Sequence, residues 1–444
     1  MKIGLEVHVA LPTESKLFCS CKAYSEEPNS SICPICMGLP GSKPMLNEKA
    51  LMLGVSIAKA LGCKVPEKIN FSRKVYFYPD LPKSYQITQV DAPVGHSGIL
   101  EADGVSIGIR RIQLEEDPAK IIREEEYTLL DFNRSGVPLV EIVTEPDIKS
   151  EATLKTFLTE LKSILYYLGV DINKEFKADL NISVAEQRVE IKNITGTKNI
   201  IDAAKYELER QNKLVSANQK VPAETRSYNE AKMITVPSRE KESDEEYGFI
   251  YEPDLSEYST ASVNAKKAVF ASRIAKEYAS KYKVNAQTLA ELVLFNEDAL
   301  EMIERWKEKY EMKALIGSIE LLEKYGIMDI SERAMVRLLD MVSKGSYPDK
   351  ETLMKIYNGG EVEVEQIDVK LIDKEISENI FLAYLPGIVE DFTFENELRY
   401  AVPVCQIYKK LSAMVPLVPA PAVQLDLFAN VFFIQGTAIE NLHI

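Results

Sequence analysis

The sequence is poor in histidine and tryptophan and contains no long apolar run. Three histidines and one tryptophan occur among 444 residues, so imidazole chemistry has few available positions. No apolar run reaches the roughly 18 residues that a membrane-spanning helix requires, and we recognise no signal or transit peptide at the N-terminus. We therefore expect a cytoplasmic protein that does not bind membranes.

Cysteine is scarce as well, and its distribution is uneven. Six cysteines are too few for a disulfide framework in a chain of this length, yet four of them form two close pairs. Two turns that present paired sulfurs can complete the tetrahedral coordination of Zn²⁺. We predict a structural zinc knuckle at residues 19–36, with disulfides or reduced thiols as the alternative. The four thiols are those of Cys19, Cys21, Cys33 and Cys36.

The net charge of −15 argues against indiscriminate binding to a phosphate backbone. A local basic surface is still compatible with a nucleic-acid partner. The most basic stretch is 266–283, where six lysines and arginines accompany the single acid Glu277. Either a solvated helix face or an RNA-contacting face would explain this stretch.

The hydrophobic pattern changes along the chain. Short alternating segments up to about residue 147 indicate strands, and helical spacing predicts helices at 47–61, 150–168 and about 199–215. The regular strand–helix alternation of a parallel sheet is missing, so we predict an α+β fold with a mixed, largely antiparallel sheet. At about 150 residues per domain, we expect a catalytic domain at 1–260, a helical domain at 261–375 and a tail of uncertain structure at 376–444.

Ionisable side chains lie on predicted strands. Residues 3–9 alternate strictly, so Glu6 and His8 share the face opposite to the apolar one. A solvated strand face would explain this pair equally well. In the segment 112–117, Glu116 falls on the same side of the predicted strand as Ile112 and Leu114. We therefore predict that the Glu116 side chain points inward and that of Glu115 points outward.

Glu141 interrupts a further strand that is otherwise apolar. Because an unpaired buried carboxylate costs several kcal/mol, we expect a cation or a function at such positions. Mg²⁺ prefers oxygen ligands, and the combined residues would form a magnesium site if their strands converge. The proposed catalytic and magnesium-binding residues are Glu6, His8, Glu116 and Glu141.

Tyrosine, lysine and aspartate crowd residues 73–86. Tyrosines can stack on a base and lysines can neutralise phosphates, although a tyrosine-rich strand edge often serves packing alone. No Walker A sequence is present, so any nucleotide would be bound by another device.

Several segments together resemble the B subunit of the aspartyl/glutamyl-tRNA amidotransferases. They occur in one order over residues 1 to about 255. The segments are IGLEVHV (3–9), KLFC (16–19), CPICMGLPG (33–41), YFYPDLPK (76–83), LEED (114–117), DFNRSGVPLVEIV (131–143), VEIKN (189–193), ETR (224–226) and EPDL (252–255).

The resemblance implies a two-step amidation of misacylated tRNA. ATP and Mg²⁺ would be used to phosphorylate the side-chain carboxylate of Glu-tRNA(Gln) or Asp-tRNA(Asn), and ammonia would then displace phosphate. It also implies a heterotrimer, in which an amidase (A) subunit releases ammonia from glutamine and a small C subunit joins the pair. The family's magnesium ligands match Glu6, His8, Glu116 and Glu141.

Further residues in or near these segments are candidates for contacts with substrate or nucleotide. They are Lys74, Tyr76, Tyr78, Asp80, Lys83, Tyr85, Asn133, Arg134, Lys192 and Asn193.

The chain departs from the family pattern at Gln113, where relatives commonly have histidine, at Pro118, where they have glycine, and after about residue 376. Two other functions remain open. A zinc-knuckle protein that binds RNA or supports assembly would explain the cysteines but not the inward glutamates. A different ATP-dependent carboxylate ligase could use the same magnesium site.

Overall fold

The computed structural model describes residues 1–172, 176–240, 248–360, 425–428 and 431–434. The chain divides into two compact units, Met1–Arg273 and Ile274–Ile444. The boundary predicted near residue 260 falls shortly before this division. Most of the predicted tail, 376–444, lies outside the described residues, apart from the antiparallel pair β16 (Leu425–Phe428) and β17 (Val431–Ile434).

The first unit is built on an eight-stranded sheet with the order β13-β12-β11-β10-β1-β9-β6-β5. All neighbouring strands are antiparallel except β11 and β12, which are parallel. The predicted α+β class with a largely antiparallel sheet is therefore confirmed. The strands are β1 (Lys2–Ala10), β5 (Gly95–Ala102), β6 (Val105–Glu116), β9 (Pro138–Thr144), β10 (Phe176–Ser183), β11 (Val189–Thr195), β12 (Glu224–Asn229) and β13 (Ile234–Glu240).

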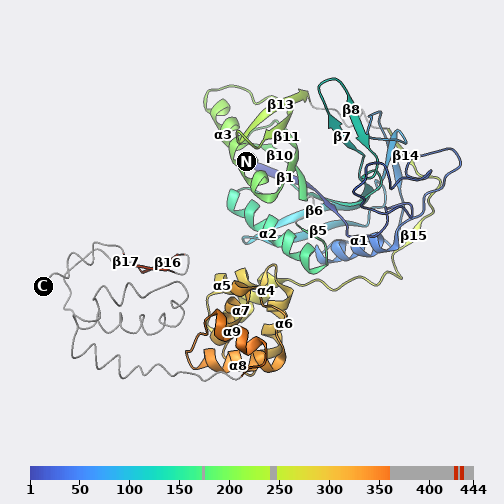
Figure 1. Cartoon of the computed structure of the whole chain (residues 1–444). Helices are drawn as coiled ribbons and strands as arrows, with labels where there is room; N and C mark the ends of the chain where they lie inside the picture. Colours follow the sequence, from blue (N-terminus) through green and yellow to red (C-terminus); the bar gives the residue numbers. More distant parts are fainter. Residues whose placement is uncertain (173–175, 241–247, 361–424, 429–430, 435–444) are drawn as a thin grey trace, which may run out of the picture. The chain divides into compact units, whose positions relative to one another are not determined.

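Three helices pack on the apolar face of this sheet (Figure 1). They are α1 (Glu48–Ala60), α2 (Glu151–Tyr167) and α3 (Thr197–Ser216), and they correspond to the three helices predicted for this region. Side chains cap the N-termini of the first two helices. Asn47 accepts a hydrogen bond from the backbone N–H of Ala50, and Ser150 accepts one from the backbone N–H of Thr153. The core lies between helices and sheet and contains Leu5 of β1. The polar side chains of the central strand β1, Glu6 and His8, lie on the other face of the sheet.

A small sheet lies beside the far end of β6, beyond the last residue that pairs with β5. Its middle strand is β3, and β4 is the edge strand next to β6. Side-chain hydrogen bonds, rather than backbone pairing, join β4 to β6. Gln86 Nε2 donates to the carbonyl of Glu116 at 2.7 Å, and Gln89 Oε1 accepts from the N–H of Leu114 at 2.9 Å. The end of β6 is therefore covered. The remaining strands of the first unit are β2 (Lys68–Ile69), β3 (Ser72–Val75), β4 (Tyr85–Thr88), β7 (Lys120–Arg123), β8 (Thr128–Asp131), β14 (Gly248–Tyr251) and β15 (Tyr258–Ser259).

The described part of the second unit is helical up to residue 360, in agreement with the helical region predicted to follow the sheet. No helix in the described ranges has the length and apolar character needed to cross a bilayer. Within the basic stretch, Lys281 pairs with Glu308 at 3.4 Å, and whether the stretch contacts RNA stays a prediction. The helices are α4 (Ala271–Tyr282), α5 (Ala286–Val293), α6 (Glu297–Trp306), α7 (Met312–Tyr325), α8 (Glu332–Ser343) and α9 (Lys350–Tyr357).

Gly98 on β5 makes a close approach that only glycine allows. A Cβ at this position would overlap the Cys63 sulfur and the Leu61 carbonyl oxygen, which is a backbone atom and cannot move freely. We expect Gly98→Ala to lower the free energy of unfolding by about 1–3 kcal/mol, measured by chemical denaturation. Gly248→Ala is the matched control, since its Cβ would meet Val75 at an ordinary 3.7 Å. Equal stability of the two variants would contradict this packing.

Candidate active site

Strand register gathers polar side chains on the face of the sheet opposite to helices α1 to α3. His8 on β1 lies directly opposite Glu141 on β9, and Gln113 on β6 lies opposite Glu141 from the other side. One row further along the strands, Glu6 lies opposite Asp179 on β10. Directly opposed residues in antiparallel strands point to the same face. The four central strands therefore form one acid-rich surface.

The first cluster on this surface consists of His8, Glu115 and Glu141. Their ligand atoms lie within 4.8 Å of one another, and His8 Nε2 is 3.4 Å from Glu115 Oε1. Both glutamates are 6% exposed. Thr88 donates to Glu115 at 3.3 Å, while Gln113 donates to Glu141. Two carboxylates and an imidazole held in this way fit a divalent cation such as Mg²⁺.

Electrostatics of the first cluster also favour a cation. Burial raises the pKa of Glu141, and the neighbouring charge of Glu115 raises it further. Burial alone would lower the pKa of His8, but the carboxylates of Glu115 and Glu141 raise it above its ordinary value. The protein itself therefore leaves excess negative charge here, which a bound cation would compensate.

A second cluster consists of Glu6, Asp179 and Glu190, whose oxygens also lie within 4.8 Å of one another. Lys192, a predicted contact residue, is 3.4 Å from Asp179 and 3.2 Å from Glu190. The backbone N–H of Asn193, another predicted residue, donates to Asp179 at 2.7 Å. Burial is the main cause that raises the pKa of Glu6. This cluster is a second place where carboxylate oxygens could hold a cation.

Glu116 joins neither cluster among the residues that the structure describes. Its carboxylate pairs with Lys83, and it accepts a hydrogen bond from the N–H of Ile87 at 2.8 Å. Glu115 and Glu116 lie on opposite faces, as alternation predicted, but His8 and Glu141 occupy the face of Glu115. The expectation that Glu115 points to solvent is wrong because both faces of β6 are covered at this end.

The tyrosine-rich segment is held in place by ionic contacts. Arg73 binds Glu252 through Nε at 2.7 Å and Nη2 at 2.8 Å, and its guanidinium lies 4.5 Å from the ring centre of Tyr85. Lys83 lies 5.5 Å from the same ring. Of the predicted contact residues, Lys83 and Tyr85 thus have structural partners that account for their positions.

The other predicted residues of this segment are Lys74, Tyr76, Tyr78 and Asp80, of which only Tyr78 is exposed. Lys74 Nζ lies 5.7 Å from the ring centre of Tyr76, and the exposed Tyr78 hydroxyl accepts from Arg123 at 3.1 Å. Burial raises the pKa of Asp80, whose Oδ1 has no hydrogen-bond partner among the described residues. This oxygen is buried, so the structure does not present it to a ligand.

The four clustered cysteines come together as predicted. Their sulfurs lie within 4.8 Å of one another, and all four are free thiols. A hydrogen bond from Cys19 lowers the pKa of Cys36, and Lys16 Nζ lies 3.7 Å from the Cys36 sulfur. Lys16 is fully buried and also donates to the carbonyl of Phe132 at 3.1 Å. Four sulfurs in this arrangement could hold a metal ion, and their chemistry fits structural Zn²⁺.

Hydrogen bonds join this knuckle to the end of β8 and to the loop that follows it. The N–H of Asn29 donates to Asp131 at 3.1 Å, and the N–H of Ser31 donates to Asn133 at 2.8 Å. The side-chain amide of Asn133 donates a hydrogen bond to the carbonyl of Glu27 at 2.6 Å. Asn133, which we predicted as a substrate contact, therefore links the knuckle to this loop.

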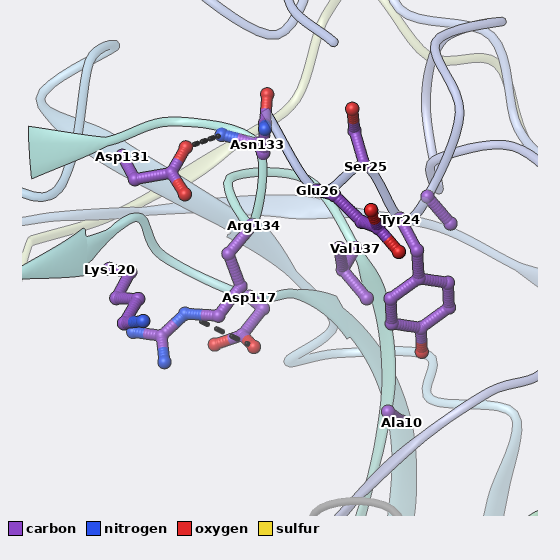
Figure 2. A pocket seen from close by; sticks show the side chains of 11 residues that line it. Ala10, Tyr24, Ser25, Glu26, Asp117, Lys120, Asp131, Asn133, Arg134 and Val137 are labelled. Atoms are coloured by element: carbon purple, nitrogen blue, oxygen red, sulfur yellow. Dashed lines mark hydrogen bonds and ion pairs between the residues drawn. The ribbon is translucent and has the colours of Figure 1, made fainter. Parts of the chain in front are cut away.

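A pocket of about 570 Å³ lies between the knuckle and this loop (Figure 2). Arg134 is anchored there by bonds to the carbonyls of Pro118 at 2.9 Å and Ala119 at 2.8 Å, and it lies 3.5 Å from Asp117. Ala10 also lines the pocket. Because Ala10 follows His8 by two residues on one strand, the pocket adjoins the first carboxylate cluster.

Residues 1–265 match the family model described as the GatB/GatE catalytic domain. Three similar proteins carry the name of the B subunit of aspartyl/glutamyl-tRNA(Asn/Gln) amidotransferase. The one from Saccharolobus solfataricus is 42% identical over 342 residues, 72% of each chain. The one from Thermus thermophilus is 43% identical over 265 residues, 57% of this chain and 56% of the relative.

The third relative, from Clostridium kluyveri, is 35% identical over 376 residues, which cover 77% of this chain and 79% of the relative. The family model matches more than half of the chain, including both carboxylate clusters and the knuckle. The chain therefore belongs to the family of aspartyl/glutamyl-tRNA amidotransferase B subunits.

Proposed function

We propose that this chain activates the side-chain carboxylate of misacylated tRNA with ATP and then converts it to the amide. The substrate would be Glu-tRNA(Gln) or Asp-tRNA(Asn), and the chain would act as a carbon–nitrogen ligase. The observation that carries this proposal is the cluster of His8, Glu115 and Glu141 beside an open pocket. A buried site for a divalent cation next to a pocket whose lining includes Lys120 and Arg134 suits phosphoryl transfer.

Each residue of the first cluster has a defined task in this proposal. Mg²⁺ bound here would neutralise the charge of the nucleotide phosphates. His8, Glu115 and Glu141 would supply the ligand atoms, and Glu6, Asp179 and Glu190 could hold a second cation. Gln113 and Thr88 orient the carboxylates through the hydrogen bonds described above. Gln113 therefore contributes a donor at the position where relatives commonly have histidine.

The reaction would need two displacements. An oxygen of the substrate carboxylate attacks the terminal phosphorus, the bond to the bridging oxygen breaks, and ADP leaves. Ammonia then attacks the acyl carbon, loses a proton, and phosphate leaves as the amide forms. Arg134, anchored in the pocket, would help to position the negatively charged substrate.

Partners complete the proposed function. Ammonia would come from glutamine through an amidase (A) subunit, and a small C subunit would complete a heterotrimer. Zn²⁺ in the knuckle would be structural, because four cysteines leave no open coordination position. A different ATP-dependent carboxylate ligase is the second candidate, since the same carboxylate clusters would serve it.

The test supplies the chain and its partner subunits with misacylated tRNA, ATP, Mg²⁺ and ammonium. We expect amide formation with one ADP per product, and a loss of more than about 100-fold in Glu141→Gln because a metal ligand is removed. Glu101→Gln, on the exposed side of β5, should keep full activity. Amide formation at the normal rate in Glu141→Gln would contradict the assigned site. ADP formation with another carboxylate and none with tRNA would favour the second candidate.

A further inference from the structure

Arg111 lies on the acid-rich surface without a salt bridge to any described residue. It lies on β6 opposite Val143, which in turn lies opposite Glu6 on β1. Arg111 therefore belongs to the row of Glu6 and Asp179 and is a diagonal neighbour of Glu141. Its Nε atom is buried without a hydrogen-bond partner, and the side chain forms no ion pair within the described part of the chain.

Several other arginines of the same unit pair with carboxylates. Even the adjacent Arg110, which is exposed, binds Glu145 through Nε at 3.0 Å and Nη2 at 2.8 Å. Arg111 is half-buried, yet within the described ranges it forms no ion pair. The arginines with carboxylate partners include Arg73 with Glu252, Arg110 with Glu145, Arg134 with Asp117, Arg210 with Glu207 and Arg226 with Glu224.

A partly desolvated guanidinium requires an acceptor, and the chemistry of the site indicates which one. The nearby carboxylates are gathered in two clusters whose geometry suits cations. The remaining ligand of opposite charge would be an oxyanion supplied from outside. A guanidinium binds two phosphate oxygens through a planar pair of N–H donors, whereas an ammonium acts as a point charge.

We propose that Arg111 binds a phosphoryl oxyanion beside the two carboxylate clusters. This inference rests on the proposed function and adds to it a residue for the transferred group. As the phosphorus passes from the bridging oxygen of ATP to the carboxylate oxygen, charge spreads over its three other oxygens. Arg111 contacts two of these oxygens and neither gives nor takes a proton.

The experiment compares Arg111→Met and Arg111→Lys with a control variant at the exposed Arg188, Arg188→Met, in the assembled complex. Formation of ADP and amide is measured at saturating ATP and misacylated tRNA. We expect Arg111→Met to be about 10²–10³-fold slower, as when one donor to a developing oxyanion is lost. Arg111→Lys should recover part of the rate, and Arg188→Met should match the unmodified protein. A rate for Arg111→Met within threefold of the unmodified protein would overturn the proposal.

Two binding measurements separate the possible explanations. Calorimetry with Mn²⁺ should give the same affinity for Arg111→Met and the unmodified protein, so a loss of Mn²⁺ binding would show a structural role and overturn the proposal. Calorimetry with Mg²⁺ and either inorganic phosphate or ATP should show weaker binding in Arg111→Met. If weakening is confined to ATP, the anion is the nucleotide phosphate; if neither binding changes, the proposal fails. Suppose that Arg111→Met binds phosphate more weakly but the unmodified protein forms no amide. That result would refute the proposed function and leave the anion site at Arg111 standing.

Discussion

Glu115→Gln is expected to abolish tight binding of a divalent cation, whereas Glu116→Gln should leave that binding intact. The two residues are adjacent on β6 but point to opposite faces. Only Glu115 lies with His8 and Glu141, at 3.4 Å from the imidazole. Loss of one anionic ligand from a three-residue cluster should weaken Mn²⁺ binding more than about 100-fold. Amide formation should fall with it.

We expect Glu116→Gln to lower the stability of the fold rather than the affinity for the cation. The side chains of Lys83 and Glu116 are 6% and 5% exposed, so the substitution leaves a buried ammonium without its counter-charge. Breaking a buried ion pair in this way costs about 3–5 kcal/mol. We therefore expect a clearly lower melting temperature for Glu116→Gln than for Glu115→Gln.

Calorimetric titration with Mn²⁺ and thermal unfolding, applied to both variants, check this expectation. Glu101→Gln serves as an exposed control that should change neither quantity. If Glu116→Gln lost the cation while Glu115→Gln retained it, the ligand set would have to be the one that strand parity suggested, and Glu115 would be a supporting residue.

The local pattern of the sequence predicted which face of a strand each side chain occupies, but not what covers that face. Glu6, His8 and Glu141 share one face because side chains alternate along β1 and β9. Parity alone suggested that the face of Glu115 is solvated. The face of Glu115 is buried because hydrogen bonds of Gln86 and Gln89 join β4 to β6. These two strands are not adjacent in the sequence.

The second cluster was missed for a related reason. Asp179 and Glu190 alternate with apolar residues, which was a usable signal for two half-buried strands. Nothing in the local pattern shows that β10 lies next to β1, because about 170 residues separate Glu6 from its partner Asp179. The cysteine knuckle was predictable, since all four thiols lie within one short segment and their spacing is itself the signal.

Cys36→Ser is expected to remove the zinc that the unmodified chain should carry at one ion per chain. Serine is a poor ligand for Zn²⁺, and structural zinc sites contribute about 10–16 kcal/mol of apparent binding free energy to folding. The effect should extend beyond the knuckle, because Asn29 and Ser31 hold Asp131 and Asn133 through hydrogen bonds. Without the metal, we expect this loop, and Arg134 with it, to lose its position.

Elemental analysis and the amidation assay test both parts of this expectation. Cys36→Ser should contain no zinc, should melt at a lower temperature and should form amide at a strongly reduced rate. Cys63→Ser is the matched control: its thiol lies outside the cluster, so zinc content and activity should stay unchanged. Zinc-free unmodified protein with full activity would remove the knuckle as a metal site. Zinc loss in Cys36→Ser without loss of activity would instead show that the loop holds Arg134 without help from the knuckle.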